Sequence, residues 1–77
     1  MVTGLVLVRL MSGNEKDALA KIKETKGVSH VCAVFGRWDL VLDMETEDLP
    51  SLSKTVVEKI RSIPGVLSSE TLVTTAI

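Results

Sequence analysis

The sequence predicts an α+β fold in which four strands and two helices follow the order β-α-β-β-α-β. One observation is that apolar, β-branched runs of strand length alternate with two stretches whose apolar residues recur at helical spacing. A second is an internal echo, in which Lys21-Ile22-Lys23 and Gly27-Val28 return in the second half as Lys59-Ile60-Arg61 and Gly65-Val66. Two such halves make the ferredoxin-like sandwich, a four-stranded antiparallel sheet with both helices on one face.

The first half begins with a strand from Gly4 to Met11 that is apolar at both alternations, which is typical of a strand covered on both faces. Ser12-Gly13 breaks this pattern, and Asn14 is expected to cap the helix that follows. The helical spacing ends at Lys26-Gly27, a pair typical of a helix C-terminus. The second strand is predicted from Val28 to Phe35.

The second half begins with a third strand from Trp38 to Glu45. Asp48 is expected to cap the second helix, and Pro50 fits its first turn because no N–H is needed there. Pro64-Gly65 ends this helix, and the fourth strand is predicted from Val66 to Thr75. The apolar stripe of the second helix is Leu52, Val56, Ile60 and Ile63.

One small domain is predicted over residues 1–77. A chain of this length buries only a modest core, and small domains gain stability from disulfides, metals or self-association. Cys32 is the only cysteine, so no intrachain disulfide can form, and no further ligand at metal-binding spacing accompanies His30. We therefore expect neither metal nor cofactor, and self-association remains.

The helix-free face of the predicted sheet is expected to bind a second copy of the chain. The first strand is apolar on both alternations, and the second nearly so, with Val28 and Val31 placed on opposite faces. Apolar side chains on an uncovered face lose the free energy of burial. Val6 and Val8 share one face of the first strand, and Asp at either position is expected to split or unfold the dimer.

Charge and hydropathy exclude several classes of partner. The net charge of −1 gives no basic surface for DNA or RNA, so no direct nucleic-acid binding is expected. No apolar run approaches the roughly 18 residues of a membrane span, and no leader pattern precedes the first strand. These observations predict a cytoplasmic protein without a membrane partner.

The turn Gly36-Arg37-Trp38-Asp39 joins the second and third strands in a predicted hairpin. It contains the only Trp, and the only Phe, Phe35, directly precedes it. Gly36 provides the backbone freedom of a tight reversal, and Asp39 can accept hydrogen bonds from main-chain amides. Two interpretations remain open: a purely structural turn, or a ligand-contacting loop on a rigid sheet.

The sequence offers few groups for catalysis. His30 and Cys32 fall on the same side of the second strand, and Asp43 and Glu45 share a face of the third. Such neighbours on a strand pack or face solvent more often than they react, and no third orienting group is evident. We expect no enzyme. The alternative is a dimeric ferredoxin-like enzyme of the monooxygenase or isomerase type, which requires His30 or Cys32 inside its pocket.

Gly36-x-x-Asp39 between two apolar strands, in a chain of this element order, resembles the RAM domain, the effector-binding module of the Lrp/AsnC regulators. Ile63-Pro64-Gly65-Val66 followed by Ser69-Glu70-Thr71-Leu72 is similar too, so the resemblance covers essentially the whole chain. Two features depart from that family. A helix-turn-helix DNA reader usually precedes the module, so a stand-alone form is expected here. Trp38 stands where relatives often have Tyr.

The resemblance implies a regulatory module that binds a small effector, often an amino acid. It also implies a dimer through facing sheets, dimers that close into a ring, and ligands held between dimers. A second possibility is an adaptor that co-assembles with full-length Lrp/AsnC regulators. The effector contacts carried over by the resemblance are Gly36, Arg37, Trp38 and Asp39, with Thr71, Thr74 and Thr75 as further candidates.

Overall fold

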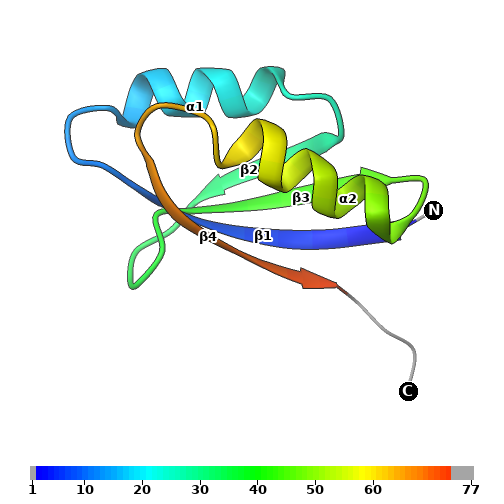
Figure 1. The fold of residues 1–77 in the computed structure, drawn as a ribbon. Coiled ribbons are helices and arrows are strands. Elements are labelled where there is room, and N and C mark those ends of the chain that lie inside the picture. The colour runs from blue at the N-terminus through cyan, green and yellow to red at the C-terminus, as the bar shows by residue number, and fades with distance from the viewer. Residues whose placement is uncertain (1, 74–77) are drawn as a thin grey trace.

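The structure, a computed structural model, describes residues 2–73 (Figure 1). Its elements follow the predicted order, which confirms the ferredoxin-like fold. A π-helical segment, η1, continues the second helix. The elements are β1 (Val2–Leu10), α1 (Glu15–Glu24), β2 (Val28–Ala33), β3 (Leu40–Thr46), α2 (Leu49–Thr55), η1 (Val56–Ile60) and β4 (Val66–Val73).

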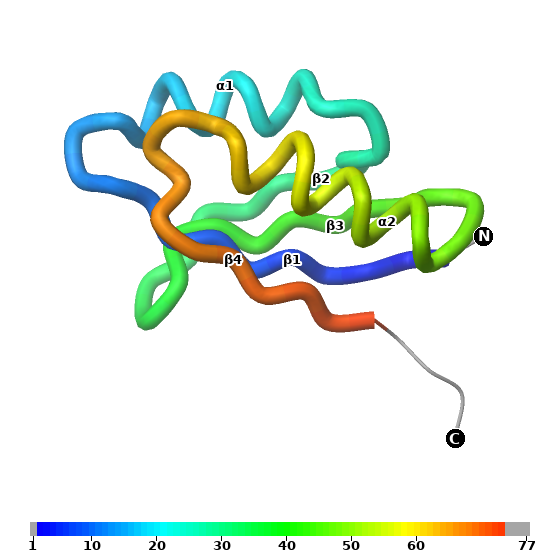
Figure 2. The backbone as a smooth tube through the Cα atoms, in the orientation of Figure 1, coloured from blue at the N-terminus to red at the C-terminus, as the bar shows by residue number. Residues whose placement is uncertain are grey.

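The four strands form one sheet in the order β2-β3-β1-β4, and every neighbouring pair is antiparallel. Both helices cover the same face of this sheet, and the other face carries no helix (Figures 1 and 2). None of the helices in residues 2–73 is long and apolar enough to cross a membrane.

The core lies between the sheet and the two helices. Even-numbered residues of β1 and β3 point into it, because side chains alternate between the faces of a strand. Ile22 of α1 and the predicted stripe of the second helix cover them. The buried apolar residues are Val6, Val8, Leu10, Ala18, Ile22, Leu40, Leu42, Met44, Leu52, Val56, Ile60 and Ile63.

The choice of Val6 and Val8 to mark the dimer face was wrong. Both side chains are fully buried beneath the helices, so they belong to the core of a single chain. The odd-numbered residues of β1 occupy the helix-free face instead. Leu5 lies opposite Leu72 of β4, and the two side chains remain 40% and 49% exposed.

The predicted alternation of the second strand was also wrong. The pairing of β2 with β3 shifts between Val28 and His30, so one extra residue enters the strand. Val28 and Val31 consequently both pack against the core rather than on opposite faces. β2 ends at Ala33, two residues before the predicted end. The predicted end of the fourth strand, at Thr75, lies outside the described residues.

The two helix starts differ in how they are capped. Asp48 caps α2 as predicted: its Oδ1 accepts a hydrogen bond from the Ser51 N–H at 2.8 Å. Asn14 occupies the cap position of α1, but its side chain makes no capping hydrogen bond. The Glu15 Oε1 accepts a hydrogen bond from the Gly13 N–H at 2.8 Å, which ties the first helical residue to the turn before the helix.

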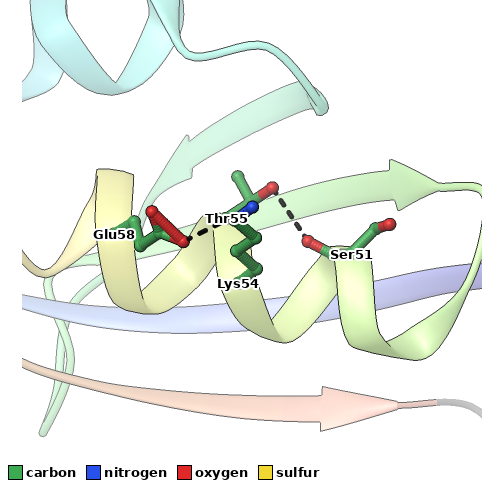
Figure 3. A network of polar contacts seen from close by, with 4 residues as sticks. All are labelled: Ser51, Lys54, Thr55 and Glu58. Atoms are coloured by element: carbon green, nitrogen blue, oxygen red, sulfur yellow. Dashed lines mark hydrogen bonds and ion pairs between the residues drawn. The ribbon is translucent and has the colours of Figure 1, made fainter.

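The second helix widens at its midpoint from an α to a π geometry. The Arg61 N–H donates to the Val56 carbonyl, five residues earlier, at 2.9 Å. On the outer surface the Thr55 hydroxyl donates to the Ser51 carbonyl at 2.9 Å, as Figure 3 shows. The exposed Lys54–Glu58 ion pair at 4.0 Å in the same view contributes little stability. Single π turns inside α-helices occur frequently at functional sites.

Candidate ligand-binding groove

The turn between β2 and β3 projects away from both helices (Figure 1). The Val34 N–H donates to the Asp39 carbonyl at 2.9 Å and closes the turn. Gly36 has a φ of 135°, a conformation that other residues rarely adopt, so the predicted need for glycine is confirmed. Phe35 at the tip is fully exposed. The turn is therefore a short, closed loop that presents an apolar side chain to solvent.

Asp39 fastens this turn to the end of β1. Its Oδ2 accepts a hydrogen bond from the Leu10 N–H at 2.8 Å, and its own N–H donates to the Val8 carbonyl at 2.9 Å. The register between β1 and β4 shifts between Arg9 and Leu10. The Leu10 N–H that donates to Asp39 therefore lies at this irregularity. One carboxylate oxygen of Asp39 is thus already used in holding the turn.

Trp38 and Thr71 line one groove of about 600 Å³ between the second helix and β4. The fold therefore brings together two of the seven predicted contact residues. Gly36, Arg37 and Asp39 do not line the groove, and Thr74 and Thr75 lie outside the described residues. The groove is lined by Trp38, Leu49, Leu52, Ser53, Val56, Val57, Arg61, Ser69, Glu70, Thr71 and Val73.

The middle of the groove is apolar. Leu52 and Val56 are buried and form its floor, while Leu49, Val57 and Val73 are each partly exposed along its sides. Exposed apolar side chains around a hollow favour a ligand with an apolar portion, because burying them releases water from both surfaces.

One end of the groove is polar. The Arg61 Nε donates to the Ser69 Oγ at 2.9 Å, which joins the end of the second helix to β4. Ser69 lies opposite Val8 in the sheet. The Val8 carbonyl accepts a hydrogen bond from the N–H of Asp39, the residue that follows Trp38. Trp38, Ser69 and Arg61 therefore gather at the same end.

The other end of the groove is marked by Val73, which lies opposite Gly4 in the sheet. A Cβ on Gly4 would lie 2.8 Å from the Leu52 Cδ2, so the helix approaches the sheet closely here. Val73 and Ser69 are four residues apart, and a strand rises about 3.3 Å per residue, so the two ends are separated by roughly 13 Å.

Arg61 was not predicted as a site residue. It lies outside the apolar stripe of the second helix, and its side chain is exposed. Its position depends on the π turn between Val56 and Ile60 and on a hydroxyl supplied by β4. No local sequence pattern predicts the π turn or the hydrogen bond to Ser69.

A second, larger hollow of about 690 Å³ lies between the end of α1, the end of β3 and the second helix. None of the predicted contact residues lines it, and its lining residues are all polar, charged or glycine. Its lining residues are Glu24, Thr25, Lys26, Gly27, Glu45, Thr46, Glu47, Ser51, Thr55 and Lys59.

His30 and Cys32, which an enzyme of the monooxygenase or isomerase type would require inside its pocket, do not line the groove. His30 pairs with Asp43, and Cys32 with Val41, which places both on the helix-free side of the sheet. Both side chains are exposed. Within residues 2–73, no group of three or more His, Cys, Asp or Glu side chains is arranged to hold a metal ion.

The model of the Lrp/AsnC ligand binding domain family matches residues 3–76. The chain belongs to this family. The sequence resemblance to the RAM domain is thereby confirmed, and it extends over nearly the whole chain.

Regulators are among the relatives of this Lrp/AsnC domain. A helix-turn-helix-type transcriptional regulator of Pyrococcus furiosus is 32% identical over 74 residues, which are 92% of this chain and 49% of that regulator. The chain thus spans about half the length of the curated relatives it matches.

Solved structures agree with this fold. A Thermus thermophilus protein has a TM-score of 0.92 and 31% identity, with 100% of this chain and 96% of that chain covered. A Neisseria meningitidis regulator, crystallised in complex with L-methionine, has a TM-score of 0.90 and 18% identity. Its match covers 97% of this chain and 50% of the regulator, and at that identity it supports the fold alone.

Proposed function

We propose that this Lrp/AsnC domain is a non-catalytic regulatory module that binds a free amino acid in the groove beside β4. The observation that carries the proposal is the convergence of Trp38, Thr71 and Arg61 on a hollow with an apolar floor. A few polar groups around an apolar surface are the usual composition of a small-molecule site. A Neisseria regulator of the same fold was crystallised with L-methionine, and we propose the same class of ligand for this chain.

The same proposal includes self-association through the helix-free face of the sheet. Leu5, Leu7, Val41 and Leu72 lie together there because Leu5 pairs with Leu72 and Leu7 with Val41. Burying a medium apolar side chain contributes about 1.5–3 kcal/mol, so a patch of this size favours a dimer. Dimers that further assemble into a ring would bring turns and grooves of different chains into proximity.

Sedimentation of the purified chain, with and without each of the twenty amino acids, tests this function. We expect a dimer or larger assembly, and at least one amino acid should change its size distribution. A ligand that prefers one assembly state shifts the population toward it, with a coupling on the order of 1–3 kcal/mol. A stable monomer that responds to none of the amino acids contradicts the proposal.

An adaptor role is the second candidate. The chain matches only about half of the Pyrococcus regulators, so its helix-free face is expected to resemble that of the corresponding half in such proteins. Co-expression with a full-length homologous regulator distinguishes the two roles. Mixed assemblies that form equally well with and without amino acids favour the adaptor, whereas amino-acid-dependent assembly favours the sensor.

A further inference from the structure

We infer that the helix-free face of the sheet selects a partner whose own face carries basic side chains, and that two identical copies of this chain pair less tightly. The inference rests on the proposed function, which makes this face an interface, and it specifies the chemistry of the partner. That partner is a second domain of the same fold with lysine or arginine where this chain has Asp43 and Glu70.

Six side chains form a block on this face, because directly opposite residues of antiparallel strands lie side by side. Leu5 of β1 lies between Asp43 of β3 and Leu72 of β4. The neighbouring row, centred on Leu7, has the reverse arrangement, with its apolar residue on β3 and its carboxylate on β4. The two carboxylates thus occupy diagonally opposite corners. The members of the block are Leu5, Leu7, Val41, Asp43, Glu70 and Leu72.

Water solvates both carboxylates of the block in the single chain. Asp43 is half-buried and Glu70 is exposed. Within residues 2–73 the ion pair is elsewhere, between Lys54 and Glu58 on the second helix. A partner that covers the apolar side chains also displaces water from the carboxylates beside them. This displacement is unfavourable unless a positive group replaces the water.

A second copy of this chain does not supply that positive group. If two copies stack with their strands aligned and β1 over β1, a two-fold axis runs either along the strands or across them. Either axis places each carboxylate over Val41 or Leu72 of the other copy. Self-association therefore buries the apolar side chains and leaves the carboxylates without a cation.

The basic side chains of the chain lie mainly on its other side. Every lysine is in α1, in the second helix or directly after α1. On the strands of the helix-free face, within residues 2–73, the basic side chains are Arg9 and His30, both outside the block. A partner with lysine or arginine on its own face would instead match the two carboxylates, and such complementarity selects among partners.

Mixing with a charge-reversed copy tests the inference. The probe is the double variant Asp43→Lys/Glu70→Lys, which presents lysine at both corners of the block. Wild type is mixed with an equal amount of the isotope-labelled probe, and native mass spectrometry in ammonium acetate measures the homodimers and mixed dimers. The equilibrium constant for forming mixed dimers should exceed its statistical value roughly 10-fold at low ionic strength. The excess should shrink at high ionic strength, because salt screens charges that are partly exposed.

Glu24→Lys/Glu58→Lys is the matched control, because it makes the same change in net charge on the exposed surface of the helices. This control should form mixed dimers with wild type at the statistical value. If the probe does so too, the carboxylates do not select the partner, and the inference is wrong while the face remains an interface. If wild type and probe form no dimer, alone or mixed, the proposed self-association is wrong as well.

A neutral variant, Asp43→Asn/Glu70→Gln, separates charge from misfolding, because it preserves the size of both side chains. In sedimentation equilibrium its homodimer should be roughly 3- to 10-fold tighter than that of wild type at low ionic strength. An unchanged Kd would contradict the inference. Millimolar Mg²⁺ at constant ionic strength should not tighten the wild-type dimer. If it does so to the level of the neutral variant, the carboxylates bind a cation and the inference of a basic partner fails.

Discussion

The carboxylate of Asp39 accepts a hydrogen bond from the backbone N–H of Leu10 at 2.8 Å, so a side chain of the turn completes the end of β1. These residues are 29 positions apart in the chain. The turn that holds Trp38 is consequently fixed relative to β1, and through β1 relative to Ser69 on β4. The position of Trp38 in the groove therefore depends on this hydrogen bond.

Asp39→Ala is expected to lower the free energy of unfolding by about 1–3 kcal/mol, because the Leu10 N–H loses its acceptor. Asp39→Asn keeps a side-chain oxygen and should cost less. Denaturant unfolding gives the free energies, and hydrogen exchange of the Leu10 amide reports the contact itself. Unchanged Leu10 protection in Asp39→Ala, together with lost ligand binding, would assign the side chain to the ligand instead of the turn.

Leu5→Asp and Val6→Asp should have opposite consequences although the residues are adjacent. Val6 is fully buried between the sheet and the helices, so an unpaired carboxylate there should unfold the chain. Leu5 lies on the helix-free face and is 40% exposed, so its variant should remain folded and lose the dimer. Circular dichroism and sedimentation velocity distinguish the outcomes. A folded dimer of Leu5→Asp would exclude this face as the interface.

Asp48 should make stability depend on acidic pH. Hydrogen bonds from Ser51, through its side chain and its backbone N–H, lower the pKa of the Asp48 carboxyl below its usual 3.8. A carboxyl with a depressed pKa stabilises the fold above its unfolded pKa, and this contribution is lost as the pH falls through the folded pKa. Asp48→Ala should therefore lower Tm at pH 7 and have little effect at about pH 2.

Asp48→Asn is the control for that experiment, because Asn also caps helices but does not titrate. Its Tm should stay close to that of wild type at pH 7. If the difference between wild type and Asp48→Ala persists undiminished at about pH 2, the ionised cap is not its cause.

Gly65→Ala should destabilise the protein more than Gly13→Ala. Both glycines have a positive φ, 100° and 98°, so alanine pays a similar backbone cost at each. A Cβ on Gly65 would also lie 2.8 Å from the Asn14 Cβ, whereas a Cβ on Gly13 would meet nothing within 4 Å. The extra cost for Gly65 should be about 1–3 kcal/mol, measured by denaturant unfolding. Equal costs would contradict the close packing between the start of α1 and the loop before β4.

The sequence predicted best the features that depend on near neighbours. Asp48 caps a helix through an amide three residues away, and Gly36 reverses the chain within the turn, so both were evident from local patterns. The order of strands and helices followed from hydrophobic periodicity. Hydrophobic periodicity did not predict which residues of β2 face the core. The register shift after Val28 arises from the pairing of β2 with β3, which the sequence of β2 alone does not reveal.

The groove itself was only partly predictable. Trp38 and Thr71 were selected from the resemblance, but their proximity is produced by β1, which lies between β3 and β4. Arg61 reaches the groove through a π turn and a hydrogen bond to Ser69. These contacts depend on how the strands and helices pack together. Hydrophobic periodicity and turn residues therefore do not predict them.

Amide and indole chemical shifts of isotope-labelled protein, titrated with L-leucine and L-methionine, test the central claim most directly. Trp38 contributes the single indole N–H signal of the chain, which makes it an unambiguous reporter. We predict saturable shifts of that signal and of the Val57, Arg61 and Thr71 amides, with little change around Glu24 and Glu47 in the polar hollow. Shifts confined to the polar hollow, or no shifts at millimolar amino acid, would contradict binding in the groove beside β4.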